Sequence, residues 1–166
     1  MKRIITTLLL IGTILTSYSQ TPLDYKVFEK INEYRVENGI HELTWCDTTY
    51  QAAKHHTDYM IKNKIIRHHE DNETPKFTYR LRLYLQHGIN TGDENLAWVP
   101  LNDIEDSTDK IANSIVNVWK DSKGHNSTML TKGNDIGAVS CGNGVIIDEV
   151  DEWNGKYSTL LVWSRW

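Results

Sequence analysis

Three ionisable side chains that are far apart in the sequence have the chemistry of a shared ligand site. Glu94 lies in the segment 93–98, which continues into the apolar residues Leu96, Ala97 and Trp98, and His125 closes a helix-like segment, residues 119–125. His68 supplies a second imidazole upstream. Two imidazoles and one carboxylate can bind a divalent metal such as zinc with one coordination position left open, or can polarise a water molecule. We therefore predict that His68, Glu94 and His125 line one cleft.

Local features of the two segments support this prediction without deciding the role. Gly124 precedes His125 and would let the chain turn sharply at a helix end, which would aim the imidazole inward. Asn95 follows Glu94 and could hold neighbouring backbone groups with its amide. A carboxylate among apolar residues is costly unless it is paired or metal-bound. A buried Glu–His hydrogen bond that only ties a strand to a helix is therefore an open alternative to ligand binding and to catalysis.

Length, charge and hydrophobic content describe one ordinary globular domain. The 166 residues carry a net charge of −4, with 24% charged and 39% hydrophobic residues, which suffices for a core without metal or disulfide staples. No stripe of Lys and Arg marks a nucleic-acid surface. Because no linker, repeat or low-complexity tract interrupts the later chain, we predict a single domain over residues 21–166.

The first 20 residues are typical of a secretory signal peptide. Lys2 and Arg3 form a basic start, residues 4–15 are mostly apolar, and small polar residues follow up to Gln20. The apolar stretch is too short for a comfortable membrane span. We predict an exported protein, secreted or periplasmic, without a transmembrane segment in the mature chain. An uncleaved anchor helix is the alternative.

Export would place the two cysteines in an oxidising compartment. Cys46 and Cys141 could then form one disulfide, although the pair alone does not decide whether the bond forms. Two cysteines are too few for a metal site made only of thiolates.

Helical periodicity covers the first two-thirds of the chain, where apolar residues recur three and four positions apart. Caps and breakers set the ends of these segments. The predicted helices are one that ends at Asn38 and Gly39, one from an Asp47 N-cap to about Lys62, a shorter one opened by Thr74 and Pro75 and ended by Gly88, and one from near Ser107 with the stripe Ile111, Ile115, Val118 and Trp119.

After Gly133 the apolar pattern becomes strand-like. Strands are predicted over residues 136–140, 145–150 and 157–163, with hairpin turns at residues 142–144 and 154–155. Helices followed by an antiparallel sheet at the C-terminal end indicate an α+β fold, with helices layered on the sheet.

Five segments together resemble a known family. They are residues 31–39 with 43–45, residues 52–60, the Glu-Asn-Leu-Ala string at 94–97, the Trp…Gly-His string at 119–130, and residues 135–138. In this order they are similar to the CAP superfamily of cysteine-rich secretory proteins, antigen 5 and pathogenesis-related 1 proteins, in its bacterial form. The resemblance implies a three-layer α-β-α sandwich with a central cavity lined by two histidines and acidic residues.

The resemblance also implies a role for each candidate residue. Glu94 matches the motif glutamate and His125 the motif histidine, and His68 is expected to be the second cavity histidine, with its neighbour His69 as the alternative. Asp93 stands where the family usually has glycine. Ser122 stands where animal members have a second glutamate, and Asp121 is the nearest acid that could replace it.

Three functions follow from this resemblance as hypotheses. The first is an exported binding module that takes a divalent metal such as zinc, a small apolar or lipid-like molecule, or a component of the cell envelope. The second is a metal-dependent peptidase or esterase that uses His68, His125 and Glu94, although neither a His-Glu-x-x-His nor a Gly-x-Ser-x-Gly motif occurs. The third is a surface interaction protein whose cleft is only structural. The oligomeric state is left open.

Overall fold

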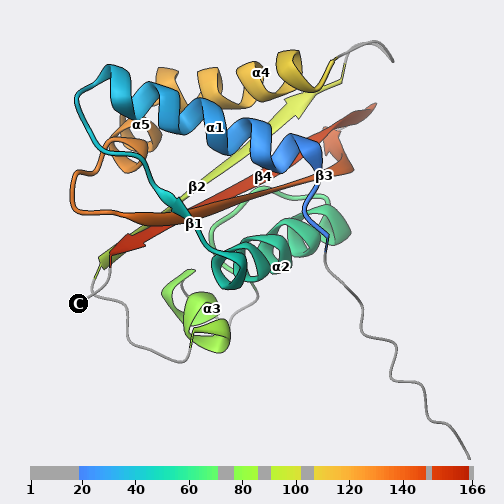
Figure 1. The fold of residues 1–166 in the computed structure, drawn as a ribbon. Coiled ribbons are helices and arrows are strands. Elements are labelled where there is room, and N and C mark those ends of the chain that lie inside the picture. Colours follow the sequence, from blue (N-terminus) through green and yellow to red (C-terminus); the bar gives the residue numbers. More distant parts are fainter. Residues whose placement is uncertain (1–18, 71–76, 86–90, 102–106, 149–150, 165–166) are drawn as a thin grey trace, which may run out of the picture.

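A four-stranded mixed sheet lies between two layers of helices in the computed structural model (Figure 1). The structure describes residues 19–70, 77–85, 91–101, 107–148 and 151–164. Helices α1, α4 and α5 cover one face of the sheet, and α2 and α3 cover the other. This arrangement confirms the predicted α+β fold with three layers.

Helices and strands alternate along the chain more than predicted. The elements are α1 (Pro22–Glu37), β1 (Thr44–Trp45), α2 (Asp47–Asn63), α3 (Phe77–Tyr84), β2 (Thr91–Pro100), α4 (Thr108–Asp121), α5 (Lys123–Met129), β3 (Ile136–Asp148) and β4 (Asp151–Ser164). The strand order is β1-β3-β4-β2, with β1 parallel to β3 and the other pairs antiparallel. The C-terminal antiparallel sheet is therefore completed by two strands from earlier in the chain.

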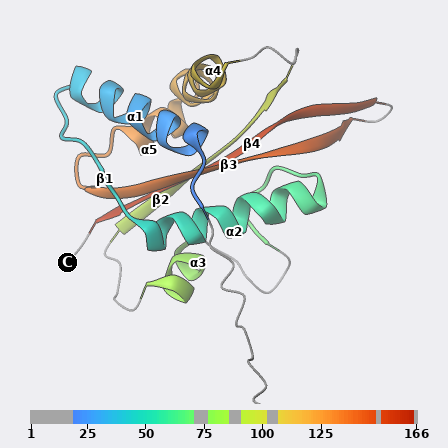
Figure 2. The same ribbon diagram turned by 45° about the vertical axis from the view of Figure 1, so that its right-hand side comes forward.

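The predicted turns within the C-terminal sheet are wrong. Residues 142–144 and 154–155 lie inside β3 and β4, which pair continuously from Ile136–Trp163 to Asp148–Asp151. In Figure 2 this long hairpin extends beyond the helical layers. The strands connect through residues 149–150, which lie outside the described residues.

The glycines that suggested turns instead make room for side chains. A Cβ on Gly144 would stand 2.7 Å from the ring of Tyr157, and one on Gly155 would stand 2.3 Å from the indole of Trp98. These glycines are therefore needed for close packing inside a strand, a role that the sequence pattern does not separate from a turn.

Most helix ends follow from capping. Thr21 and Asp24 form a capping box at the start of α1, and Gly39 has a φ of 69° where that helix ends, as predicted. The predicted N-cap of α2 is off by one residue, because Cys46 occupies the N-cap and Asp47 begins the helix. The Asp47 carboxylate instead accepts a hydrogen bond from the indole N–H of Trp45 at 2.8 Å.

The third and fourth helices match the prediction in part. The predicted start of α3 at residues 74–75 and its end at Gly88 fall outside the described residues. Ser107 caps α4, and Ile115 and Trp119 are buried as predicted. Val118 is instead 42% exposed, since the buried stripe of α4 is formed by Ala112, Ile115, Val116 and Trp119.

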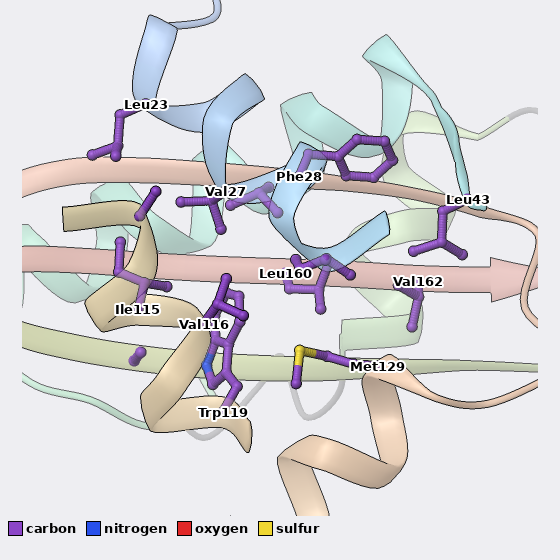
Figure 3. Close-up of a cluster of buried hydrophobic side chains, with 14 of the residues drawn as sticks. Leu23, Val27, Phe28, Leu43, Ile115, Val116, Trp119, Met129, Leu160 and Val162 are labelled. Atoms are coloured by element: carbon purple, nitrogen blue, oxygen red, sulfur yellow. The ribbon is translucent and has the colours of Figure 1, made fainter. Parts of the chain in front are cut away.

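The largest apolar cluster lies between the sheet and the layer of α1, α4 and α5 (Figure 3). Trp119 is fully buried there, and its indole N–H donates to the carbonyl of Leu96 at 3.0 Å. The buried Arg35 closes one end of this layer by donating to several backbone carbonyls, including that of Met129 at 2.6 Å and that of Asn134 at 2.9 Å. A smaller cluster packs α2 and α3 against the opposite face.

The two cysteines are free thiols in this structure. Cys141 lies in β3, where burial raises the pKa of its thiol. Its sulfur accepts a weak hydrogen bond from the hydroxyl of Ser158 at 3.5 Å.

Within the part of the chain that the structure describes, no helix has both the length and the apolar character needed to cross a membrane. The predicted signal peptide falls almost entirely on residues 1–18, which lie outside that part.

Candidate functional site

His68 and Glu94 come together although 26 residues separate them in the sequence. Glu94 lies in β2, and its side chain is only 1% exposed. Its Oε1 is 2.9 Å from Nδ1 of His68, whose side chain is 53% exposed. With Nδ1 facing the carboxylate, the other ring nitrogen of His68 is available to a ligand, as in carboxylate–histidine–metal sites.

Arg80 occupies the second oxygen of Glu94. Its guanidinium donates to Glu94 Oε2 and, at 3.1 Å, to the backbone carbonyl of His68. Arg80 lies in α3 and is fully buried. Because a guanidinium stays protonated in proteins, the buried carboxylate of Glu94 always has a cationic partner.

The charged network continues from Arg80 to Glu70 and His56. Arg80 Nε is 3.6 Å from Glu70 Oε1, and Nδ1 of the fully buried His56 is 2.7 Å from the same oxygen. Nε2 of His56 faces the carbonyl oxygen of Arg67 at 2.9 Å. Both partners of the His56 ring are acceptors, so the ring satisfies both only when each nitrogen carries a proton.

Glu70 is held in its ionised form by these neighbours. Burial alone would raise the pKa of Glu70. The hydrogen bond from His56 and the charges of Arg80, His55 and His56 outweigh that effect and leave the pKa below its ordinary value of 4.5. The region behind His68 is therefore a compact set of paired buried charges.

His125 approaches from the opposite layer, on α5. Glu94 and Asn95 are neighbours in β2, so their side chains point to opposite faces of the sheet. Glu94 reaches His68 and Arg80, whereas Asn95 donates from its amide to the backbone carbonyl of His125 at 2.8 Å. Because β2 is an edge strand, residues from both layers can approach each other around that edge.

The imidazole of His125 has one nitrogen that lacks a hydrogen-bond partner. Its Nδ1 is buried and has no hydrogen-bond partner. Burial lowers the pKa of His125, and the nearby charge of His68 lowers it further, so the neutral ring with a free lone pair is favoured.

The turn expected at Gly124 is absent, because this residue lies within the first turn of α5 and its φ is not positive. The chain bends at Ser122, which lies between α4 and α5 and caps α5 by accepting from the His125 N–H. The position at which the resemblance suggested a second acid therefore positions the histidine backbone.

The remaining candidates lie apart from this site or at its border. Asp121 is exposed at the end of α4, and none of the described contacts joins it to His68, Glu94 or His125. His69 is exposed next to His68, which is the histidine that faces Glu94. Asp93 accepts a hydrogen bond from the amide of Asn134 at 3.4 Å.

The site offers a metal two imidazoles but not a complete set of protein ligands. Over the described residues, no three His, Cys, Asp or Glu side chains are arranged to hold an ion. Two ring nitrogens are left for a ligand: Nδ1 of His125, which has no partner, and the nitrogen of His68 that does not face Glu94. Both oxygens of Glu94 are engaged, so in this structure the carboxylate orients His68. The prediction that His68, Glu94 and His125 hold zinc stays a prediction.

A pocket of about 490 Å³ lies elsewhere, on the outer face of α2 beside α3. Its lining is formed by Gln51, Lys54, His55, Asp58, Tyr59, Lys62 and Tyr84. None of the predicted site residues lines it, but His55 connects it to the charged network, because His55 Nε2 is 3.4 Å from Glu70 Oε2.

Sequence reasoning missed Arg80 and Glu70, which make up the interior of the network. Nothing in the local sequence distinguishes the buried Arg80 from its exposed neighbour Arg82. Glu70 lies two residues beyond His68, outside the predicted site. His56 of α2 also belongs to this interior: it is fully buried, and both of its ring contacts are polar. The available signal was a cluster of charges, His68 to Glu70, directly after a helix.

Comparison with known proteins identifies the fold independently. The model of a family described as CAP, the cysteine-rich secretory protein family, matches residues 28–145. Comparison with curated protein sequences found no match.

Solved structures of three bacterial proteins are similar to this one. An outer surface protein from Borrelia burgdorferi aligns with a TM-score of 0.65 and 23% identity, over 89% of this chain and 97% of that one. An extracellular protein with an SCP domain from Bacillus anthracis has a TM-score of 0.62 and 20% identity, over 90% and 45%. A cysteine-rich secretory protein from Staphylococcus aureus has a TM-score of 0.56 and 16% identity, over 90% and 40%. This chain therefore spans less than half of the length of the last two, and at these identities the likeness concerns the fold.

Proposed function

The chain belongs to the CAP, or cysteine-rich secretory protein, family, and on that premise we propose that it is an exported binding module that holds a divalent metal between His68 and His125. Zinc is one of the divalent metals that imidazole ligands suit, and its bound form would supply an open coordination position for water or for a ligand group. Glu94 acts here by orienting His68.

One observation carries this proposal. Nδ1 of His125 is a buried polar atom without a partner, and the ring of His68 is held by Glu94 at the other side of the β2 edge. A buried polar atom without a partner costs free energy, so its presence at this place supports a ligand there. The lowered pKa of His125 keeps its ring in the neutral form that metals bind.

Export is part of the same proposal. The signal-like residues 1–20 support it, together with similar proteins that are described as an outer surface protein and an extracellular protein.

The contacts of Glu94 make hydrolysis a weaker alternative than binding. A general base must be free to accept a proton from water. Both oxygens of Glu94 already accept hydrogen bonds, from His68 and from Arg80. This favours binding over a peptidase or esterase reaction at the same residues.

Metal analysis of the purified full chain tests the proposal. Protein purified without metal-chelating columns is measured for zinc by elemental analysis and titrated with zinc by calorimetry. We expect one zinc per chain in the wild type and no stoichiometric zinc in His68→Ala or His125→Ala. His69→Ala is the matched control, because His69 is an exposed neighbour of His68 that should not affect binding. Zinc that is absent from the wild type, or equal in all variants, would contradict the proposal.

A further inference from the structure

We propose that the pocket on the outer face of α2, beside Tyr84 of α3, binds a small organic anion that carries a flat ring, with Lys62 as the residue that recognises the negative charge. This α2 pocket has a volume of about 490 Å³, and neither His68 nor His125 lines it. The inference therefore goes beyond the proposed function and does not depend on a metal.

The α2 pocket has the size of a small-molecule site. Pockets that bind small ligands typically measure about 300–1,000 Å³, and this volume lies within that range. All of its lining residues except Tyr84 lie on α2, at spacings of three and four residues that place them on one face of the helix. A bare inorganic ion such as phosphate would leave most of this volume to water, so the size favours an organic ligand.

The lining of the α2 pocket carries one more positive than negative charge when His55 is neutral, because it contains Lys54, Lys62 and a single acid, Asp58. Lys54 and Asp58 are paired at 2.8 Å, so these two charges offset each other. Lys62 is exposed, and among the described residues its ammonium has no hydrogen-bond or ion-pair partner. The chain as a whole has a net charge of −4, so this local excess is opposite to the average. The pocket should therefore attract an anion and repel a cation.

The inner wall of the α2 pocket is held in place before a ligand arrives. Nε2 of His55 lies 3.4 Å from Oε2 of the buried Glu70, and Nδ1 of His55 lies 2.9 Å from the hydroxyl oxygen of Tyr84. The rings of His55 and Tyr84 meet edge to face, with centroids 6.2 Å apart. Side chains that are already ordered lose less conformational entropy when a ligand binds, which favours affinity.

Two tyrosine rings favour a ligand with a flat apolar part. Tyr59 and Tyr84 line the α2 pocket from different helices. The ring of Tyr59 is also supported from within the protein, because it lies nearly parallel to the ring of the buried His56, with centroids 6.1 Å apart. Contacts between aromatic rings add to the gain from burying apolar area. An aromatic acid, of which benzoate is a simple example, matches both the rings and the charge of Lys62.

Titration of the full chain with benzoate and two matched compounds tests the inference. Benzyl alcohol has the same ring without a charge, and benzylamine has the same ring with a positive charge. NMR spectra of the isotope-labelled protein at low ionic strength give both the affinity and the residues that respond. We expect saturable binding of benzoate with shifts in the amide signals of α2, and binding that is about tenfold or more weaker for the other two, which lack the charge-assisted hydrogen bond to Lys62. Equal affinity for all three, or no binding of benzoate, would overturn the inference.

Two substitutions at exposed positions of α2 should change the affinity in opposite directions. Lys62→Gln should weaken benzoate binding about tenfold, because it removes the cation that recognises the carboxylate. Asp58→Asn should strengthen binding by up to about fivefold, because it releases the charge of Lys54. Lys64→Gln is the matched control: it removes the same charge two residues away, from a side chain that pairs with Glu152 and does not line the pocket. An equal loss in Lys62→Gln and Lys64→Gln would reduce the effect to net charge and refute the role of Lys62.

The result is separable from the zinc measurement of the proposed function. Lys62→Gln should leave the zinc content of the chain unchanged, because Lys62 lies outside the cleft of His68 and His125. If benzoate binding is lost in His125→Ala and kept in Lys62→Gln, the anion binds in that cleft and the α2 pocket is refuted as its site. Failure to bind zinc would refute the proposed function and leave the α2 pocket untouched.

Discussion

The two faces of the sheet are covered by layers of different character. The layer of α1, α4 and α5 rests on a continuous apolar cluster that includes Val27, Trp119 and Leu160. The layer of α2 and α3 has two smaller apolar clusters and, beside them, the buried charges of Glu70, Arg80 and Glu94. The comparison suggests that the first layer mainly stabilises the fold, whereas the second layer gives up apolar area to hold a polar site.

The two layers also differ in how their interactions contribute to stability. Apolar burial stabilises in proportion to the area removed from water and tolerates changes of shape within limits. Paired buried charges contribute little net stability, but the removal of one partner leaves the others uncompensated. Single substitutions should therefore destabilise both layers, but only in the site layer should further substitutions of the partner charges repair the loss.

The largest expected effect lies in the apolar layer. Trp119→Ala should lower the free energy of unfolding by about 3–5 kcal/mol, because it empties a fully buried volume and removes the hydrogen bond to the Leu96 carbonyl. Urea denaturation followed by circular dichroism measures this change. Val118→Ala is the matched control on the same helix, with a side chain that is 42% exposed, and it should have little effect. A similar loss in both variants would erase the distinction between buried and exposed positions of α4.

An effect of similar or slightly smaller size is expected in the site layer. Arg80→Met should cost about 3–5 kcal/mol, because Glu70 and Glu94 lose their shared cation. The addition of Glu70→Gln and Glu94→Gln should restore much of that loss. The same urea measurement applies, and the comparison fails if the triple variant is as unstable as Arg80→Met alone, since packing would then explain the loss.

The smallest expected effect is the pH dependence that Glu70 gives to the site layer. The pKa of Glu70 is lower in the folded protein than its ordinary value of 4.5, so the unfolded chain takes up the proton first as pH falls. The contribution of Glu70 to stability is thus complete above about pH 4.5 and is lost as pH falls through the folded pKa.

Unfolding midpoints between about pH 3 and pH 6 measure this loss, and its source is tested with Glu70→Gln. That variant should flatten the curve in this window, whereas Asp58→Asn, at an exposed ion pair of α2, should not. A wild-type curve that Glu70→Gln leaves unchanged would place the acid sensitivity elsewhere.

Much of the fold could be predicted because local signals and tertiary packing agree. Gly39 ends α1 in the left-handed conformation that the sequence predicted. The start of that helix at the capping box of Thr21 was not predicted. The strand glycines misled the prediction, because Gly144 and Gly155 accommodate aromatic rings that come from other positions in the sheet. Such a tertiary contact leaves no mark in the local pattern.

The site could be predicted only where a residue type is costly without a partner. Glu94 attracted attention because a carboxylate stands among apolar residues, and the structure gives it His68 as a partner. Arg80 and Arg82 flank Leu81 symmetrically, yet only Arg80 is buried. The choice between them depends on how α3 packs against β2, which sequence spacing does not encode.

The edge strand β2 constrains which changes of sequence the molecule can accept, because its pairing register must be kept. Glu94 contacts the layer of α2 and α3 and Asn95 contacts α5 of the other layer, so a shift of β2 by one residue in its pairing with β4 would exchange the two faces. The carboxylate would then turn toward α5 and away from Arg80. Homologous chains that keep the Glu94 and Asn95 contacts should therefore vary in the length of their loops, whereas β2 should change by substitution alone.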